Sequence, residues 1–131
     1  MSGNADISVV LVDDNDIVRE CVGAYLEDEG FTVFYAVDGE EALELVAQQL
    51  PTTCISDLRL PGMSGEAFIE QAFGISPVTA YLLHTGSDYL LSDTLRSLGM
   101  TPEDVFFKPI HELATLTDRI RARALRRGAT V

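Results

Sequence analysis

The sequence predicts an α/β domain of three layers, a five-stranded parallel sheet doubly wound with helices on both faces. The main observation is that short apolar runs alternate, five times over, with stretches whose apolar residues recur at helical spacing. The apolar runs are nearly continuous, as in strands buried on both faces. Each intervening stretch is long enough for a helix, which favours parallel strands joined by right-handed crossovers.

The first strand and helix have clear boundaries. Residues 7–12 form a β-branched and almost wholly apolar run, which predicts the first strand. Asn15 or Asp16 can cap the helix that follows through a side-chain oxygen. Gly30 suits the end of this helix, because glycine readily adopts the left-handed conformation that closes many helices.

The next two strands frame a second helix. Residues 31–37 predict the second strand, and Asp38 with Glu41 forms a capping-box-like start for the helix after it. Residues 53–56 predict the third strand, which ends at Asp57.

The middle of the chain continues the alternation. Residues 58–64 form a loop that contains proline and glycine, and a short helix is expected over residues 65–73. Residues 79–84 predict the fourth strand. Ser87 or Asp88 can start the next helix, which carries leucines along one face.

The last elements complete a single domain over residues 1–131, with a core over about 6–125. Residues 105–107 predict a brief fifth strand, and Pro109 leads into the final helix. Residues 118–131, the basic end of this helix and the tail, hold five arginines and one aspartate. They form either a solvated helix end, where cations complement the helix dipole, or a docking strip for an acidic partner.

Composition and charge exclude several classes of protein. The net charge of −12 argues against direct binding of nucleic acid, which needs a basic surface. No apolar run approaches the ~18 residues of a membrane span, and the first residues lack the features of a signal peptide. We therefore expect a cytoplasmic protein that does not contact membranes. Its two cysteines, Cys21 and Cys54, are expected to be reduced core residues.

Functional side chains gather where the predicted strands end. Asp13 and Asp14 follow the first strand, Asp57 the third, Thr85 the fourth, and Lys108, the only lysine of the chain, the fifth. Ligands of such sheets bind beyond the carboxyl ends of the strands. Three neighbouring carboxylates need cations to offset their repulsion. An all-oxygen ligand set suits Mg²⁺ better than zinc.

The same residues point to a nucleophile. Mg²⁺ typically takes one or two carboxylates, which leaves another free to form an acyl phosphate. Asp57 is the best candidate, because it lies on the central of the three acidic positions. Asp13 and Asp14 adjoin each other on an edge loop and suit metal binding. Each residue alone also has a structural explanation, such as an acidic helix start, a turn or an exposed loop. Their joint position at one end of the sheet favours the site.

Four segments at these strand ends match one known pattern. They are residues 12–14 (Val-Asp-Asp), 57–65 (Asp-Leu-Arg-Leu-Pro-Gly-Met-Ser-Gly), 85–86 (Thr-Gly) and 108–109 (Lys-Pro). In them the chain resembles the response-regulator receiver family, which includes single-domain chemotaxis regulators. The resemblance implies a flavodoxin-like strand order of 2-1-3-4-5. It also implies that the domain is no enzyme beyond its own phosphorylation and slow dephosphorylation.

The resemblance implies a role for each residue of the site. Asp57 is expected to accept a phosphoryl group from a sensor histidine kinase or a phosphotransfer protein. Asp14, Asp57 and the backbone carbonyl of Arg59 are expected to bind Mg²⁺, with Asp13 acting through water. Lys108 is expected to pair with the phosphoryl group, through a peptide bond to Pro109 that is often cis in the family.

The resemblance also implies a switch. Thr85 is expected to turn toward the phosphoryl group and change the face formed by the fourth helix, fifth strand and fifth helix, which contacts a downstream protein or forms a homodimer. This chain departs from the family at Val105, where an aromatic residue usually reports activation. The preceding loop is also about two residues longer than usual. Phe106 and Phe107 are either core strand residues or substitutes for the missing aromatic.

Four further residues near the site have open roles. Arg59 and Ser87 occupy positions that tune the phosphoryl lifetime in the family. His84 points away from the Thr85 side of its strand and is interpreted either as a packed histidine or as one whose tautomer satisfies its nitrogens, a pH-sensing role being the alternative. His111 is expected to be exposed at the start of the last helix.

Three other functions compete with phosphoryl signalling. The first is a pseudo-receiver that acts only by protein contacts, against which the complete acidic set with Lys108 argues. The second is a phosphatase with an aspartyl nucleophile, but such enzymes usually pair aspartates at alternate positions, whereas Asp13 and Asp14 are adjacent. The third is a flavin-binding module, which lacks support because no phosphate-binding loop follows the first strand.

Overall fold

The computed structural model describes residues 7–86, 88–110 and 112–129, with side chains as far as residue 125. Its main sheet has five parallel strands in the order β2-β1-β3-β6-β7, which confirms the predicted order 2-1-3-4-5. These strands are β1 (Ser8–Val12), β2 (Thr32–Ala36), β3 (Thr53–Ser56), β6 (Ala80–Thr85) and β7 (Val105–Phe107). The predictions for Ser87 and His111 lie outside the described residues.

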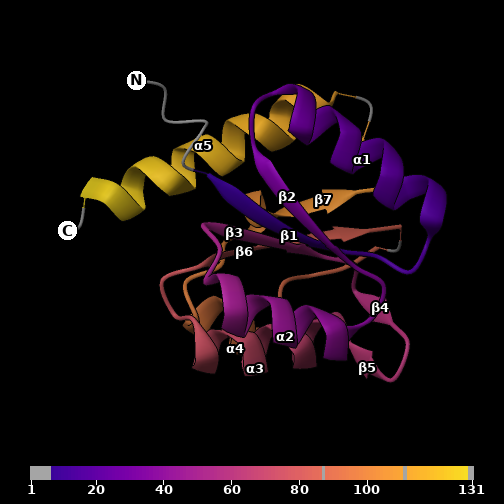
Figure 1. Ribbon diagram of the computed structural model, residues 1–131. Coiled ribbons are helices and arrows are strands. Elements are labelled where there is room, and N and C mark those ends of the chain that lie inside the picture. Colours follow the sequence, from indigo (N-terminus) through magenta and orange to yellow (C-terminus); the bar gives the residue numbers. More distant parts are fainter. Residues whose placement is uncertain (1–6, 87, 111, 130–131) are drawn as a thin grey trace.

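Helices cover both faces of the sheet, giving the predicted three layers (Figure 1). The helices are α1 (Asp16–Asp28), α2 (Gly39–Gln49), α3 (Gly65–Ile75), α4 (Asp93–Ser97) and α5 (Leu113–Ala129). One face is covered by α1 and α5, and the other by α2, α3 and α4. None of the described helices is both long and apolar enough to cross a membrane.

Two cores result from the alternation of side chains along the central strands. In β1, Val10 and Val12 pack toward α2 and α3, whereas Val9 and Leu11 pack toward α1 and α5. All four are essentially buried. Because both sheet faces are covered, β1 is apolar at four successive positions, residues 9–12, rather than at every second one.

Side-chain caps begin several helices where the sequence predicts. The Asn15 side chain accepts a hydrogen bond from the Val18 N–H and starts α1. Asp38 accepts from the Glu41 N–H and starts α2. The Glu41 carboxylate accepts from the Val37 N–H, so the reciprocal bond reaches one residue further back than in a capping box.

The helix expected from Ser87 or Asp88 begins later and is short, which corrects that prediction. It is α4, capped by the Ser92 hydroxyl through the Leu95 N–H. The preceding loop is fixed by Tyr89, whose hydroxyl bonds to Glu66 of α3 and accepts from the Ser92 N–H. These side-chain bonds replace the first turns of a helix.

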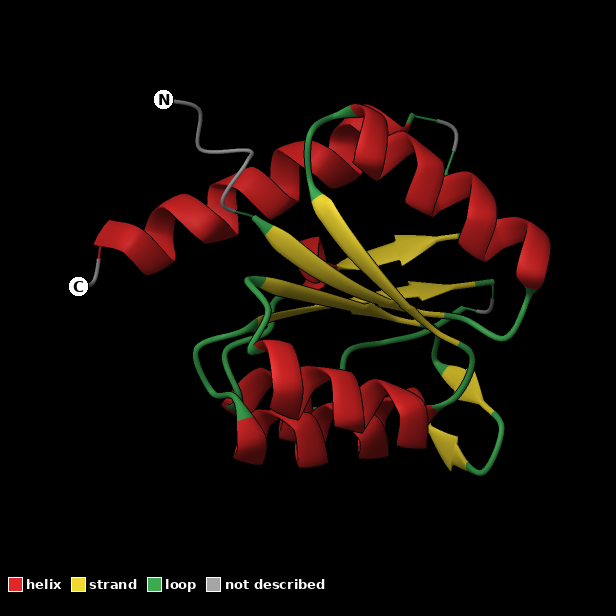
Figure 2. Ribbon diagram, in the orientation of Figure 1, coloured by secondary structure: helices red, strands yellow, loops and turns green. Residues whose placement is uncertain are grey.

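Two structural features were not predicted from the sequence. The loop after β3 contains a small antiparallel ribbon of β4 (Arg59–Leu60) and β5 (Met63–Ser64), drawn as two short arrows in Figure 2. The longer loop before β7 contains a 3₁₀ turn over Pro102–Asp104. Gly62, between the two short strands, has a φ of 84°, a conformation that favours glycine at this tight turn.

The basic end of the chain is neither a bare solvated helix nor a free docking strip in its described part. Arg119 and Arg123 of α5 both bind Asp104, which is 0% exposed. Arg121 binds Glu29 and lies over the ring of Phe31. For these three arginines both interpretations need correction, because they join α5 to neighbouring segments of the same chain.

Two predictions of core residues were also wrong, while Cys54 is buried as expected. Cys21 is exposed, because the buried face of α1 carries Val22 and Leu26 instead. Of the two interpretations of Phe107, the core residue is wrong, because Phe107 on the edge strand β7 is 49% exposed, while its role as a substitute aromatic stays a prediction.

Candidate functional site

The acidic cluster is positioned by backbone hydrogen bonds that continue the sheet. The Asp13 N–H donates to the Ala36 carbonyl, and the Asp57 N–H donates to the Val12 carbonyl. The Lys108 N–H donates to the Thr85 carbonyl at 2.7 Å. Each residue therefore directly follows a strand and is held by the neighbouring one. This brings side chains from three distant parts of the sequence to one edge.

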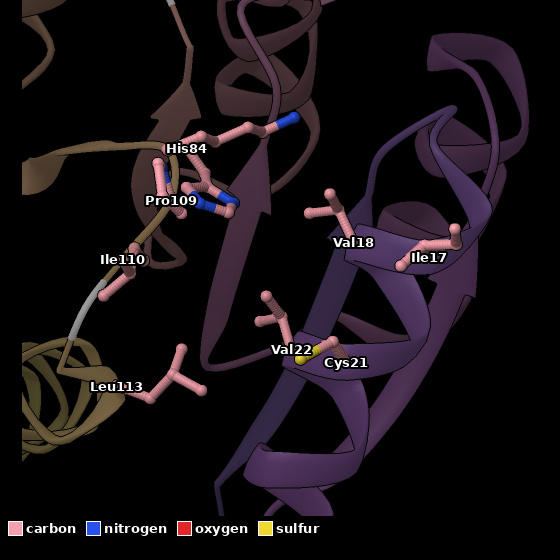
Figure 3. A pocket seen from close by; sticks show the side chains of 9 residues that line it. Ile17, Val18, Cys21, Val22, His84, Pro109, Ile110 and Leu113 are labelled. Atoms are coloured by element: carbon pink, nitrogen blue, oxygen red, sulfur yellow. The ribbon is translucent and has the colours of Figure 1, made fainter.

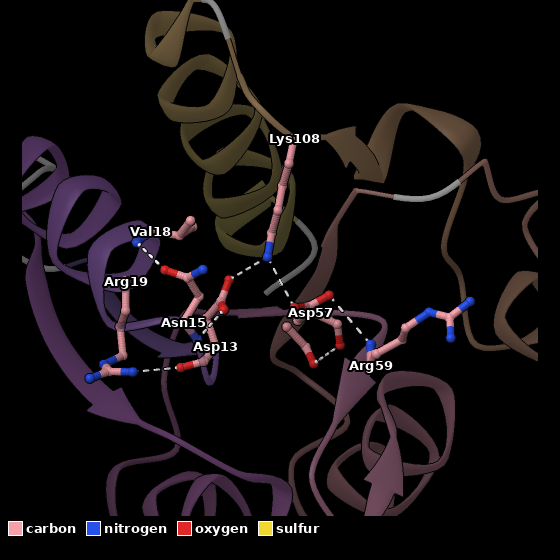
Figure 4. A network of polar contacts seen from close by, with 8 residues as sticks. Asp13, Asn15, Val18, Arg19, Asp57, Arg59 and Lys108 are labelled. Carbon is pink, nitrogen blue, oxygen red and sulfur yellow. Dashed lines mark hydrogen bonds and ion pairs between the residues drawn. The ribbon is translucent and has the colours of Figure 1, made fainter.

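Lys108 joins two of the three aspartates (Figure 4). Its Nζ lies 2.8 Å from Asp13 Oδ2 and 3.0 Å from Asp57 Oδ2. The Asp13 side chain is 2% exposed, and its other oxygen accepts from the Asn15 N–H. Burial alone would lower the pKa of Lys108, but its hydrogen bonds to Asp13 and Asp57 outweigh burial and raise the pKa. The ammonium is therefore charged at neutral pH.

The donor set fits a divalent metal ion. Asp13, Asp14 and Asp57 each offer a carboxylate oxygen, and these oxygens lie within 4.8 Å of one another. An octahedral ion with bonds of about 2.1 Å spans roughly 4 Å between opposite ligands, so a small contraction would close the set. Three carboxylates and one ammonium leave two formal negative charges, which a divalent cation would cancel.

The remaining predicted residues lie around this cluster. Asp14 is exposed beside Asp13. Thr85 ends β6, the neighbour of β3, and is 1% exposed. The Arg59 N–H donates to Asp57 Oδ1, while its side chain extends away from Asp57 in Figure 4. The Lys108–Pro109 peptide bond is cis, as the resemblance implied.

Gly65 fixes the course of the chain after Asp57. Its N–H donates to the Leu58 carbonyl at 2.6 Å. A Cβ on Gly65 would overlap the carbonyl oxygen of Asp57. Only a residue without a side chain allows α3 to start so close to the aspartate. The sequence pattern contained this glycine, but only the structure gives the reason for it.

His84 is packed, as one of its two interpretations predicted, but no described residue satisfies its nitrogens. It is buried, but neither ring nitrogen has a hydrogen-bond partner among the described residues. Its pKa is lowered to about 4, mainly by burial and also by the charge of Lys108, while Asp13 and Asp57 act in the opposite direction. The imidazole is therefore neutral at pH 7. Of the two structural interpretations, the packed histidine is therefore confirmed and the one with satisfied nitrogens is wrong.

His84 should make the protein less stable in mild acid. A histidine with a pKa of about 4 when folded and about 6.5 when unfolded binds more protons after unfolding between these values. Its contribution is therefore fully present above pH 6.5 and is lost as the pH falls toward 4. Between pH 8 and pH 5 we expect His84 to lower the free energy of unfolding by about 2 kcal/mol.

Urea unfolding of the native protein and of the His84→Leu variant at several pH values checks this expectation. The variant lacks the imidazole, whereas the carboxylates titrate in both proteins, so the difference between the two unfolding free energies isolates His84. Parallel curves of unfolding free energy against pH for the two proteins would contradict it.

The fold and this charged cluster are those of a signal-receiving α/β domain. The family model of the response regulator receiver domain matches residues 9–121, and the chain belongs to this family. Response regulators act in two-component signal transduction. Among curated relatives, the transcriptional regulatory protein CseB of Streptomyces coelicolor is 33% identical over 120 residues, which cover 92% of this chain and 50% of that protein.

Further comparisons agree. The Regulator of RpoS from Escherichia coli is 27% identical over 114 residues, 87% of this chain and 34% of that protein. The chain thus spans about a third to a half of these relatives. The receiver domain of a LuxO repressor protein from Vibrio parahaemolyticus has a TM-score of 0.83 at 26% identity, covering 95% of this chain and 94% of its own. A CheY-like receiver domain protein from Methanospirillum hungatei has a TM-score of 0.84 at 22% identity. The match covers 95% of this chain and 98% of that one, and it supports the fold.

Proposed function

We propose that this domain receives a phosphoryl group on Asp57 and changes its binding surface in response. The contact of Lys108 with both Asp13 and Asp57 is the observation that supports this proposal most directly. It places an oxygen of Asp57 beside a charged ammonium within an acidic cluster. That arrangement suits a carboxylate that attacks a phosphorus atom and must then hold a dianionic group.

Each residue of the site has its own role in the proposed phosphorylation. Asp57 supplies the nucleophilic oxygen, and Lys108 is near enough to pair with a phosphoryl oxygen on the product. Asp14, Asp57 and the Arg59 carbonyl would hold Mg²⁺, with Asp13 acting through water. When bound, Mg²⁺ would supply two positive charges against the charge of the phosphoryl oxygens. The domain then catalyses only its own phosphorylation and slow dephosphorylation.

The partners follow from this chemistry. The donor would be a histidine kinase or a phosphotransfer protein, and the product state would bind a downstream protein. Thr85 precedes the loop to α4, and its carbonyl accepts a hydrogen bond from the Lys108 backbone N–H. A movement of Lys108 would therefore also move this end of β6. The face of α4, β7 and α5 remains our proposed site for a target or for a second copy of the chain.

Labelling with acetyl phosphate tests the proposed function. We expect the protein to gain one phosphoryl group in the presence of Mg²⁺, and none with EDTA. Peptide mapping after borohydride trapping should place the modification on Asp57. Asp57→Asn should lose the labelling, whereas Asp38→Asn, at an acidic helix cap outside the site, should keep it. Unlabelled native protein that binds its partners would favour the pseudo-receiver.

Val105→Tyr, which restores the residue type usual at this position in the family, should not change the labelling. Val105 packs partly against the core on the α2, α3 and α4 side, at the start of β7, whereas Lys108 follows the other end of that strand. Its side chain can therefore affect the readout but not the chemistry. Equal rates of labelling by acetyl phosphate in the two proteins would support this, and loss of labelling in the variant would contradict it.

A further inference from the structure

An apolar cavity of about 360 Å³ lies beside the proposed phosphorylation site, between α1 and the segment that leads into α5 (Figure 3). Its walls include Val18 and Val22 from α1, and Pro109, Ile110 and Leu113 from the other side. This volume falls within the range of cavities that bind small molecules. Such cavities are mostly apolar and contain a few polar groups that orient the ligand.

His84 is the polar group of this cavity. Its imidazole lies among the lining side chains in Figure 3 and is 3% exposed. Both of its nitrogens lack a partner among the described residues. A neutral imidazole has one N–H donor and one acceptor nitrogen, and a buried group that leaves both unused destabilises the fold. A buried histidine with two unused nitrogens therefore points to a missing partner.

A water molecule alone is a poor partner. A buried water usually makes about three hydrogen bonds, and it occupies only about 30 Å³. The apolar walls around His84 offer few other groups for such bonds. A larger molecule can fill the cavity with apolar atoms and still bring one polar group to the ring. A hydroxyl group suits this role, because it both donates and accepts.

We propose that the cavity between α1 and the start of α5 binds a small uncharged apolar molecule whose hydroxyl group bonds to the ring of His84. The chemistry of the walls selects against charged ligands, since a buried charge needs a partner. The side chain of Lys108 also lines the cavity, while its ammonium binds Asp13 and Asp57. A bound molecule would therefore touch the side chain that joins the two aspartates.

Para-cresol and toluene are matched probes, because they differ only in the hydroxyl group. In an NMR titration of the full chain we expect para-cresol to shift the methyl signals of Val18, Val22 and Leu113 and the ring nitrogens of His84. Para-cresol should bind about five-fold more tightly than toluene, the effect of one net hydrogen bond. In His84→Leu this preference should disappear while toluene still binds.

A second pair of variants does not depend on replacing a buried residue. Cys21 is exposed and lines the cavity, so Cys21→Trp should obstruct it and weaken the binding of both probes. Ala24→Trp places the same side chain at an exposed position of α1 outside the cavity and should leave binding unchanged. Equal binding of the two probes to the native protein, or shifts confined to other regions, would overturn the proposal. So would a long-lived water at His84 that neither probe displaces.

Discussion

Asp104→Ala is expected to lower the free energy of unfolding by about 3–5 kcal/mol. Asp104 has no exposed surface and lies 2.7 Å from both Arg119 Nε and Arg123 Nη1. It also accepts from the Thr101 N–H, which closes the 3₁₀ turn before β7. Removing the carboxylate leaves two largely buried guanidinium groups without their central partner. Since domains of this size are stable by about 5–15 kcal/mol, the loss is a large part of the total.

Urea unfolding of the two proteins at pH 7 measures this loss. Glu103→Ala is the matched control, because Glu103 neighbours Asp104 and also contacts Arg119, but it is 78% exposed. An exposed ion pair contributes little, so this variant should differ from the native protein by less than about 1 kcal/mol. Similar stabilities for the two variants would show that burial does not determine the strength of this network.

Gly65→Ala should damage both the fold and the proposed phosphorylation site. The added Cβ would overlap the Asp57 carbonyl oxygen and lie 2.9 Å from the Leu58 Cα. Both are backbone atoms, so neither can move aside as a flexible side chain would. We expect a loss of about 3 kcal/mol in unfolding free energy. The displaced Asp57 should also be labelled by acetyl phosphate at least about ten-fold more slowly.

Gly74→Ala is the control in the same helix. A Cβ added at Gly74 would meet no atom within 4 Å beyond its own helix among the described residues, so alanine has open space there. Alanine favours a helix by about 0.5–1 kcal/mol over glycine, so this variant should be slightly more stable and should label normally. An unaffected Gly65→Ala protein would mean that the loop after β3 adjusts freely.

The order of the strands and helices could be predicted because the two patterns that mark them are local in the sequence. Continuous apolar runs mark strands buried on two faces. Capping residues such as Asn15 and Asp38 mark helix starts, because each bonds to an N–H only three residues later. Parallel strands place all their carboxyl ends at one edge of the sheet. For this reason Asp13, Asp57 and Lys108 could be brought together from the sequence, and the structure does place them in contact.

Local patterns failed where partners distant in the sequence decide the outcome. The start of α4 depends on Tyr89, which reaches Glu66 on another helix. Cys21 has the helical spacing of a core residue but lies at the side of α1 that faces a cavity. Spacing gives the angular position of a residue on its helix, but it does not tell how far the neighbouring elements extend over that position.

The sequence by itself determined the parallel sheet and the residues gathered at its edge, whereas the strand order was implied by the family resemblance. Periodicity and chain connectivity suffice for the sheet and the gathered residues, since both act through the backbone. Only the tertiary structure decided how charges pair and where space remains. In the sequence Arg119 and Arg123 belong to a basic tail, but in the fold Asp104 lies between them, and His84 lines a cavity with both nitrogens unused. Ion pairs and cavities depend on distances of a few ångströms between distant segments, which no local pattern records.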